Sequence, residues 1–569
     1  MNKKLLALLF SITPMLTFAQ EKGLDQQIDE WFQPISDFFS SVIFFPVFGT
    51  PFVLILLVAS AAFFTFYFGF PNVRYFFTAI NVVRGKYEDI EKHGAQLLYG
   101  EDGIAQGVDM NEVDDIEEHI ENVESLHSDL EIDGDIKDTI RDESHEGEVS
   151  HFQALATAVS GTVGNGNIAG VALAIALGGP GATFWMIICG LLGMSTKFVE
   201  CTLGVHYRDV GEDGTVYGGP MYYLSKGLKE KGFATLGKIA AGAFAVFCIG
   251  GSFGGGNAAQ SNQATIVIKE LLGLESTAAG AIIGVVLAIL VGIIIIGGIK
   301  RIASVTEKVV PFMALLYLLA CLYILGVNFS LIDDAISLIV TEAFNPTAIG
   351  VGGVIGVLLV GFKRAAFSNE AGAGSASIAH SAVKTKYSAS EGLVALLEPF
   401  IDTVLICTMT ALVIIIFNFG GDASGATIFQ YGGDGAGSVL IDGVSYEGAG
   451  ITSKAFAAYI PYSNLFLTVA VVLFAVSTMI SWSYYGLQSW KFLFGRGKKA
   501  DLTYKFLFLT FVVIGAAASM KSIWDFSDAM IFAMVFPNMV GLYLLMPVVK
   551  KQLKRYIDAI NLKKEAVEE

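Results

Sequence analysis

The chain has 569 residues, of which 54% are hydrophobic and 12% aromatic while only 16% are charged, and its mean hydropathy is +0.61. A soluble domain with this balance would expose large apolar patches, so the composition excludes that class and predicts an all-α membrane protein with many spans. The net charge of −17 is concentrated in one segment, because residues 88–148 hold 22 Asp and Glu against three Lys and Arg.

The first nineteen residues have the pattern of a secretory signal peptide (1–19). Lys3 and Lys4 form the charged region, residues 5–16 the apolar core, and Thr17-Phe18-Ala19 a small-x-small cleavage site. A first membrane span is the weaker alternative, because the apolar core is short. Cleavage would place the mature N-terminus outside the cytoplasm.

Two segments precede the main body of the chain. Residues 20–86 are expected to hold an amphipathic helix (24–48, with Trp31, Phe32 and Phe38) at the outer interface, followed by an extra first span. Residues 87–150 form the acidic insert, which we interpret as a solvated, partly disordered or small helical cytoplasmic segment.

Eleven apolar runs are candidate spans: about 50–70, 152–177, 182–205, 236–270, 276–297, 309–327, 347–362, 392–418, 459–482, 502–519 and 524–548. Basic residues gather in alternate connections, which the positive-inside rule assigns to the cytoplasm. These include Arg74, Arg84, Arg208, Lys300, Lys363, Arg364, Lys384, Lys386 and Lys491. The bias agrees with the signal peptide and places the tail, residues 549–569, in the cytoplasm. We therefore expect a multi-pass protein of the cell inner membrane.

Residues 161–167, Gly-Thr-Val-Gly-Asn-Gly-Asn, interrupt the run 152–177 with glycines. A helix that unwinds at membrane depth is tolerated only where it lines a cavity. A second glycine-rich stretch, residues 350–356, lies near the start of the seventh run. Interrupted helices at corresponding positions predict a 5+5 inverted repeat, 151–327 and 346–548, with its site at the midplane. Close helix packing is the alternative reason for such glycines.

Other functional classes fit less well. The runs contain no nucleophile–base set and no metal-binding motif, so we expect neither an enzyme nor a cofactor. A channel is not indicated either, since no filter repeat or ring-forming charged span is visible. Nucleic acid is not an expected partner, and the expected state is a monomer. The five cysteines lie in apolar stretches and are interpreted as packing residues.

Several long motifs resemble those of the alanine or glycine:cation symporter family. They are Gly164-Asn165-Gly166-Asn167-Ile168-Ala169-Gly170, Gly178-Gly179-Pro180-Gly181, residues 367–380 (FSNEAGAGSASIAH), 398–403 (EPFIDT) and 474–486 (FAVSTMISWSYYG). The resemblance covers about residues 30–550 in order, apart from the acidic insert. It departs at Gly164–Asn167, where the family usually has Gly-Thr-Gly-Asn, and in the altered motif 256–263.

The resemblance implies a leucine-transporter-type fold and sodium-coupled uptake of a small neutral amino acid, alanine or glycine. A proton-coupled or sodium-independent amino-acid exchanger of the same fold is the alternative. The expected partners are therefore the amino acid, sodium and the lipid bilayer.

A transported amino acid needs partners for its carboxylate and its ammonium. Free backbone N–H groups at Gly164, Asn165, Gly166 and Asn167, beside Thr162, suit the carboxylate. The ammonium could be bound by the oxygens of Asn165, Asn167 or Gln260, or by carbonyls near Gly356, and Phe362 could close the pocket. Interhelical hydrogen bonding is the alternative role for Gln260.

Sodium favours oxygen ligands. Ser477 and Thr478 offer adjacent hydroxyls in the middle of a span, although serine and threonine often hydrogen-bond back to their own helix. The resemblance implies that the other ligands would be the carbonyls of Ser160, Val163 and Phe474, at the positions that match the sodium site of that fold. Four intramembrane charged residues, Lys197, Glu200, Glu398 and Asp402, could form ion pairs or a gate.

Overall fold

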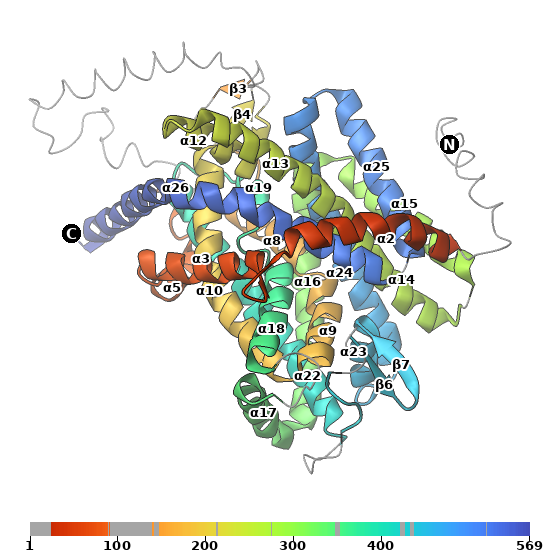
Figure 1. The fold of residues 1–569 in the computed structure, drawn as a ribbon. Coiled ribbons are helices and arrows are strands. Elements are labelled where there is room, and N and C mark those ends of the chain that lie inside the picture. Colours follow the sequence, from red (N-terminus) through yellow and green to blue (C-terminus); the bar gives the residue numbers. More distant parts are fainter. Residues whose placement is uncertain are drawn as a thin grey trace, which may run out of the picture.

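The computed structural model describes residues 24–88, 90, 139–140, 147–211, 214–274, 276–346, 353–420, 427–432, 437–518 and 520–568. The predicted signal peptide and almost all of the acidic insert lie outside these residues. Within them the protein is a helical bundle with a few short strands (Figure 1).

The first half of the described chain holds the following elements: α2 (Leu24–Ile43), β1 (Pro46–Val47), β2 (Thr50–Pro51), α3 (Phe52–Tyr67), α4 (Pro71–Arg74), α5 (Phe76–Val83), β3 (Thr139–Ile140), α8 (His151–Thr162), η3 (Asn165–Asn167), α9 (Ala169–Gly178), α10 (Gly181–His206), β4 (Asp209–Gly211), β5 (Val216–Tyr217), α11 (Pro220–Tyr222), η4 (Tyr223–Gly227), α12 (Leu228–Glu230), α13 (Ala234–Phe253), η5 (Gly254–Ala258), α14 (Ala259–Leu272), α15 (Thr277–Ile295) and α16 (Gly298–Val327).

The second half holds η6 (Phe329–Leu331), α17 (Ile332–Phe344), α18 (Gly353–Asn369), α19 (Ala376–His380), α20 (Ser388–Ala395), α21 (Leu397–Pro399), η7 (Phe400–Cys407), α22 (Thr408–Asn418), β6 (Ser438–Ile441), β7 (Val444–Glu447), α23 (Ala449–Ala457), α24 (Ser463–Phe494), α25 (Lys498–Ala517) and α26 (Met520–Glu568).

Eight helical segments of the described chain are long and apolar enough to cross a membrane, and the bent pair α8–α9 makes nine. Two further predicted spans correspond to shorter helices, α3 with 16 residues and α18 with 17. The predicted count of eleven is therefore not confirmed, although the protein is plainly a multi-pass membrane protein. The predicted amphipathic helix 24–48 is shorter than expected and ends at Ile43, where the β1–β2 hairpin begins.

The first predicted break is present. Helix α8 ends at Thr162, and the axis of α9 is bent by 57° from that of α8. Side chains replace the lost helical hydrogen bonds, as membrane depth requires. Asn167 Oδ1 accepts the N–H of Gly164 at 2.9 Å, and Thr452 Oγ1 donates to the carbonyl of Ile168 at 3.2 Å.

The second break does not lie where the glycine pattern predicted it. Gly356 lies inside the first turns of α18, which continues unbroken to Asn369. The helix is interrupted at residues 370–375 instead, before α19 begins. Glu370, Gly372 and Gly374 adopt positive φ angles of 54°, 97° and 89°, which end the helix. The glycines of residues 353–356 begin a helix and do not break one.

The two breaks meet near the centre of the bundle, between helices that come from both ends of the chain. In Figure 1, α17 and the β6–β7 hairpin lie at one end of the bundle, whereas α12, β3 and β4 lie at the other. Lys363 and Arg364, which we expected in a cytoplasmic connection, lie within α18. They contact Asp528 on α26, so they are interhelical partners and not part of the positive-inside signal.

Candidate functional site

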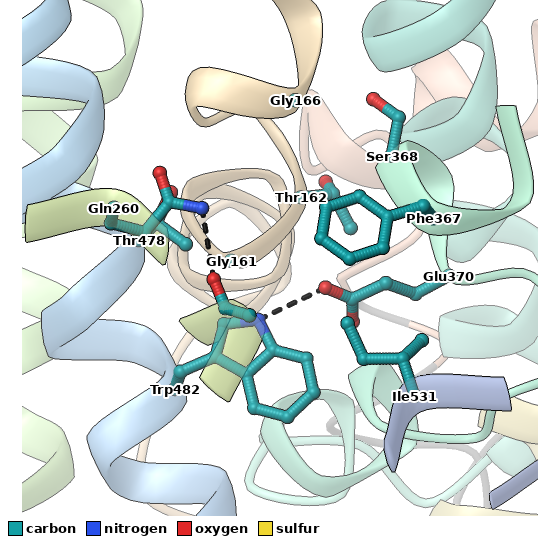
Figure 2. Close-up of a pocket in the computed structure, with 11 residues that line it drawn as sticks. Gly161, Thr162, Gly166, Gln260, Phe367, Ser368, Glu370, Thr478, Trp482 and Ile531 are labelled. Carbon is teal, nitrogen blue, oxygen red and sulfur yellow. Dashed lines mark hydrogen bonds between the residues drawn. The ribbon is translucent and has the colours of Figure 1, made fainter. Parts of the chain in front are cut away.

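A small pocket lies between the two helix breaks (Figure 2). Its volume is about 10 Å³, which is room for about one water molecule. The first break contributes Gly161, Thr162 and Gly166, and the second contributes Phe367, Ser368 and Glu370. The remaining walls come from Gly255, Gln260, Thr478, Trp482 and Ile531. In this conformation the pocket is closed to anything larger than about one water molecule, so an amino acid could enter only if the lining side chains moved apart.

The backbone of the first break is less available than the sequence suggested. Three of its four N–H groups are occupied: that of Gly164 by Asn167 Oδ1 at 2.9 Å, that of Asn165 by Gln260 Oε1 at 3.0 Å, and that of Asn167 by the carbonyl of Gly164 at 3.1 Å. Gly166 lines the pocket directly. The expectation of four free donors was therefore wrong for three of them, because side chains satisfy the unwound backbone.

Gln260 ties the long fourth span to the break. Its Oε1 accepts the N–H of Asn165, and its Nε2 donates to the carbonyl of Gly255 at 2.9 Å in the π-helical turn η5. Its own carbonyl accepts Asn165 Nδ2 at 3.2 Å. Gln260 thus joins two helices, which was the alternative role, and it also lines the pocket.

The second break places a carboxylate at the pocket. Glu370 is only 3% exposed; its Oε1 accepts the indole N–H of Trp482 at 2.9 Å, and its Oε2 accepts the hydroxyl of Ser375. Figure 2 shows Trp482, Thr478 and Gln260 on one side of the pocket and Glu370 with Phe367 and Ser368 on the other. The sequence reading missed Glu370, Trp482, Phe367 and Ser368 as lining residues, although all four lie in the family motifs.

A buried carboxylate lies beside this pocket. Asp402 is fully buried; its Oδ1 accepts Asn167 Nδ2 at 2.6 Å and the hydroxyl of Ser368 at 3.1 Å, while its Oδ2 accepts Thr403 Oγ1 at 2.6 Å. No lysine, arginine or histidine of the described residues forms an ion pair with it. Both breaks therefore meet at a carboxylate that is surrounded by oxygen and amide groups.

Four of the five residues predicted to hold sodium are joined by hydrogen bonds. Thr478 Oγ1 donates to the carbonyl of Ser160 at 3.0 Å, and Ser160 Oγ donates to the carbonyl of Ser477 at 2.7 Å. Ser477 Oγ donates back to the carbonyl of Phe474 at 3.0 Å. Val163 follows the last residue of α8 with ψ of 87°, outside the regular helix. The group supplies hydroxyl and carbonyl oxygens, which is the donor set that sodium favours.

Two predicted substrate residues lie away from the pocket. Gly356 lies in α18 on the far side of the second break from α19, and Phe362 packs against Trp185 with ring centroids 6.2 Å apart. Neither lines the pocket described above. Their placement follows from the position of the break at residues 370–375.

Comparison with known proteins identifies the family. The chain matches the sodium:alanine symporter family over residues 132–569. It is 41% identical to the sodium/alanine symporter AgcS of Methanococcus maripaludis over 73% of this chain and 86% of the relative, and 33% identical to a probable sodium/glutamine symporter, GlnT, of Bacillus subtilis over 72% and 78%. Among solved structures it is similar to MhsT in complex with L-phenylalanine, with 13% identity, 72% and 99% coverage and a TM-score of 0.44. The family match and the sequence relatives show that this chain is a transporter, not an enzyme, and that it belongs to the sodium:alanine symporter family.

Proposed function

We propose that the protein imports a small neutral amino acid, alanine or glycine, together with sodium by alternating access. One observation carries the proposal: Thr478 both lines the pocket and donates to the carbonyl of Ser160 in the oxygen-rich group. A methyl group at Gly164 would overlap Thr478 Oγ1 and lie 3.1 Å from Gln260 Oε1. The proposed sodium and substrate sites therefore share an immediate boundary.

The pocket chemistry supports a zwitterionic substrate. Gly166 and Thr162 at the first break suit a carboxylate, because the N-terminal end of α9 lies beside them. Glu370 and the carbonyls of the second break suit an ammonium group on the opposite wall. Because the closed pocket has room for only about one water molecule, small movements of its walls would admit an amino acid with a hydrogen or methyl side chain before a larger one.

Sodium can supply the driving force for accumulation. One charge moving through ~100 mV releases about 2.3 kcal/mol, and a tenfold sodium gradient adds about 1.4 kcal/mol. Together they would support accumulation of a neutral amino acid of about 500-fold. Asp402, a buried carboxylate without a cation partner among the described residues, is a candidate for additional cation binding.

Alternating access requires the pocket to be closed on each side in turn. On the side of α9 and α18, Asp528 pairs with Arg364 and, at 2.8 Å, with Lys363. The guanidinium of Arg364 also lies 5.5 Å from the ring centroids of both Phe367 and Trp524. We assign this cluster to the outer gate, since Phe367 also lines the pocket.

The proposed topology has the mature N-terminus in the periplasm and the C-terminus in the cytoplasm of an inner-membrane protein. Residues 1–19 would be the signal peptide, 20–86 the N-terminal helix and extra span, 87–150 a cytoplasmic insert, 151–327 and 346–548 the two repeats, and 549–569 the tail. Four long apolar segments, 181–206, 234–272, 278–295 and 298–327, lie between the two breaks, which supports repeats of five spans that each begin with a broken one. The β6–β7 hairpin would be periplasmic, and the α12–α13 connection cytoplasmic.

Substitutions at Gly166 test the substrate site. A Cβ there would meet Ser368 at ordinary distances of 3.6–3.7 Å, so Gly166→Ala should fold but narrow the pocket. We expect Gly166→Ala to raise the KM for alanine by about tenfold or more, and Gly166→Leu to abolish uptake. Gly242→Leu is the matched control, because Gly242 faces open space. Normal alanine uptake by Gly166→Leu, with normal membrane insertion, would refute this placement.

Removing two hydroxyls tests the sodium site. The double variant Ser477→Ala, Thr478→Ala should lose sodium stimulation of alanine uptake in proteoliposomes, since both proposed hydroxyl ligands are gone. Ser483→Ala on the same helix is the control, because Ser483 makes the same back-bond to residue i−3 (Ile480, 2.6 Å) away from the site. Unchanged sodium dependence in the double variant would exclude these ligands. Wild-type uptake that ignores the sodium gradient would instead favour the sodium-independent or proton-coupled exchanger.

Two exposed positions test the topology. Asp442→Cys lies in the β6–β7 turn and Lys231→Cys in the α12–α13 connection, and both native side chains are exposed. A membrane-impermeant maleimide should label intact cells only through Asp442→Cys, and Lys231→Cys only after permeabilisation. The native cysteines are buried and give little background. The reverse labelling pattern would invert the proposed orientation.

A further inference from the structure

A chain of five buried ionisable side chains lies on the side of the pocket opposite the proposed outer gate. Lys197 Nζ lies 3.0 Å from Glu398 Oε1, and Glu398 Oε2 lies 3.6 Å from His380 Nε2. His380 Nδ1 pairs with Glu391 Oε1, and the second oxygen of Glu391 pairs with His151 Nδ1. All but His151, which is 8% exposed as a residue, are fully buried.

The members come from separate segments and converge on α19, the short helix after the second break. Lys197 lies on α10, His151 on α8, Glu391 on α20 and Glu398 on α21, while His380 is the last residue of α19. The chain therefore holds α19 against four other elements.

Backbone contacts hold the residues after α19 at the same place. The guanidinium of Arg208 donates to the carbonyls of Ser381, Val383 and Thr385. Val383 also forms an isolated parallel bridge with Val149, just before α8. The end of α19 is thus fixed by Arg208, which follows α10, and by the segment just before α8.

His151, the last of the five ionisable residues, lies at a cavity. His151 lines a cavity of about 340 Å³ together with Ser150, Lys384 and Lys386. In the proposed topology this cavity faces the cytoplasm, so cytoplasmic protons can reach His151.

Charge counting shows why a proton matters here. With both imidazoles neutral, Glu391, Glu398 and Lys197 leave one uncompensated negative charge in a buried place, which is costly. His380 lies between two carboxylates, and only the doubly protonated imidazolium can donate toward both. One bound proton therefore balances the five-residue chain.

Among the described residues, Glu391 and Glu398 form ion pairs only with Lys197, His380 and His151. The remaining titratable or charged groups around it, from every element packed against α19, are Glu200 and Cys201 on α10, Glu370 at the second break, Tyr485 on α24, and Arg208, Lys384, Lys386, Arg84 and Glu88 around the end of α19 and the cavity.

We propose that His380, Glu391 and His151 form a proton-binding site in exchange with the cytoplasmic cavity, and that loss of its proton releases α19 and opens the inner gate. This inference rests on the proposed transport function and topology. Deprotonation would leave Glu391 and Glu398 to repel each other across His380, so alkaline cytoplasmic pH favours the inward-open state and proton binding favours the closed one.

Proteoliposomes with a fixed sodium gradient, clamped potential and constant external pH test the proposal. Initial alanine uptake by the wild type should rise about threefold or more when the internal pH is raised from about 7 to about 9.5, a range above the usual one for histidine because the two flanking carboxylates favour the imidazolium. His380→Gln should flatten this response, because glutamine cannot bind the proton, and so should Glu391→Gln. His206→Gln, at the end of α10 and outside the chain, is the matched control and should respond as the wild type does.

A flat response in the wild type, or a wild-type response in His380→Gln and Glu391→Gln, would overturn the proton site. Absence of sodium-driven alanine uptake by the wild type at every internal pH would instead refute the proposed function. The acidic insert is unchanged in all variants, so its four histidines titrate equally.

The accessibility of a buried cysteine measures gate opening without a substitution at His380 or Glu391, and so remains available if those variants do not fold. Cys201 lies one helical turn from Lys197 on the same face of α10 and is buried. In a protein that keeps only this cysteine, the alkylation rate of Cys201 should rise at alkaline pH, because opening of the gate would expose the thiol. The unfolded protein is the control for thiolate formation, and the rise in the folded protein should exceed that of the unfolded protein by about threefold or more. An equal rise in the alkylation rate of the folded and the unfolded protein would overturn the proposal. This test needs no substitution among the five ionisable residues.

Discussion

The unwound backbone at the two helix breaks governs the rest of the structure. At membrane depth every freed N–H and carbonyl group needs a partner, because water is absent. Asn167 and Gln260 supply partners at the first break, and Asn369 Oδ1 and Asn538 Nδ2 do so at the second, at 3.0 Å and 2.9 Å. Gln260 and Asn538 come from helices distant in sequence, so local contacts alone complete neither break. The pocket exists where these partially satisfied segments meet.

The sequence allowed the first break to be predicted because three glycines within six residues cannot sustain a helix. The same reasoning failed at residues 350–356, since glycine density does not separate a helix start from an interruption. The actual signal was the run from Asn369 to Ser375, where polar residues flank four consecutive alanines and glycines. Its Gly372 and Gly374 take φ values that other residues rarely adopt.

Pairing between distant residues could not be predicted from the sequence. Lys197 and Glu200 were plausible partners at helical spacing, yet Lys197 pairs with Glu398, and Glu200 Oε1 accepts Asn538 Nδ2 at 2.8 Å. Likewise, Arg364 was interpreted as a loop charge but meets Asp528, 164 positions away. Only the tertiary structure decides such contacts. Four proposed sodium residues do lie together, namely Ser160, Phe474, Ser477 and Thr478. Their grouping was proposed from a family resemblance, which carries three-dimensional information that spacing lacks.

The proposed sodium site and the proposed proton site act on different helices, one at each helix break. Thr478, Ser160 and Gly164 lie where α24 meets the first break, so an ion bound there would hold α8 against α24 while the neighbouring Gln260 holds Asn165. The charges at His380 instead act on α19, beyond the second break. A cation at the first position would thus order the pocket, whereas a proton at the second would control one exit. Because Glu370 lies at the second break and lines the pocket, substrate bound there would be in contact with the segment from which α19 begins. Coupling between occupancy and gate opening then needs only the short stretch from Glu370 to Ala376 to change conformation.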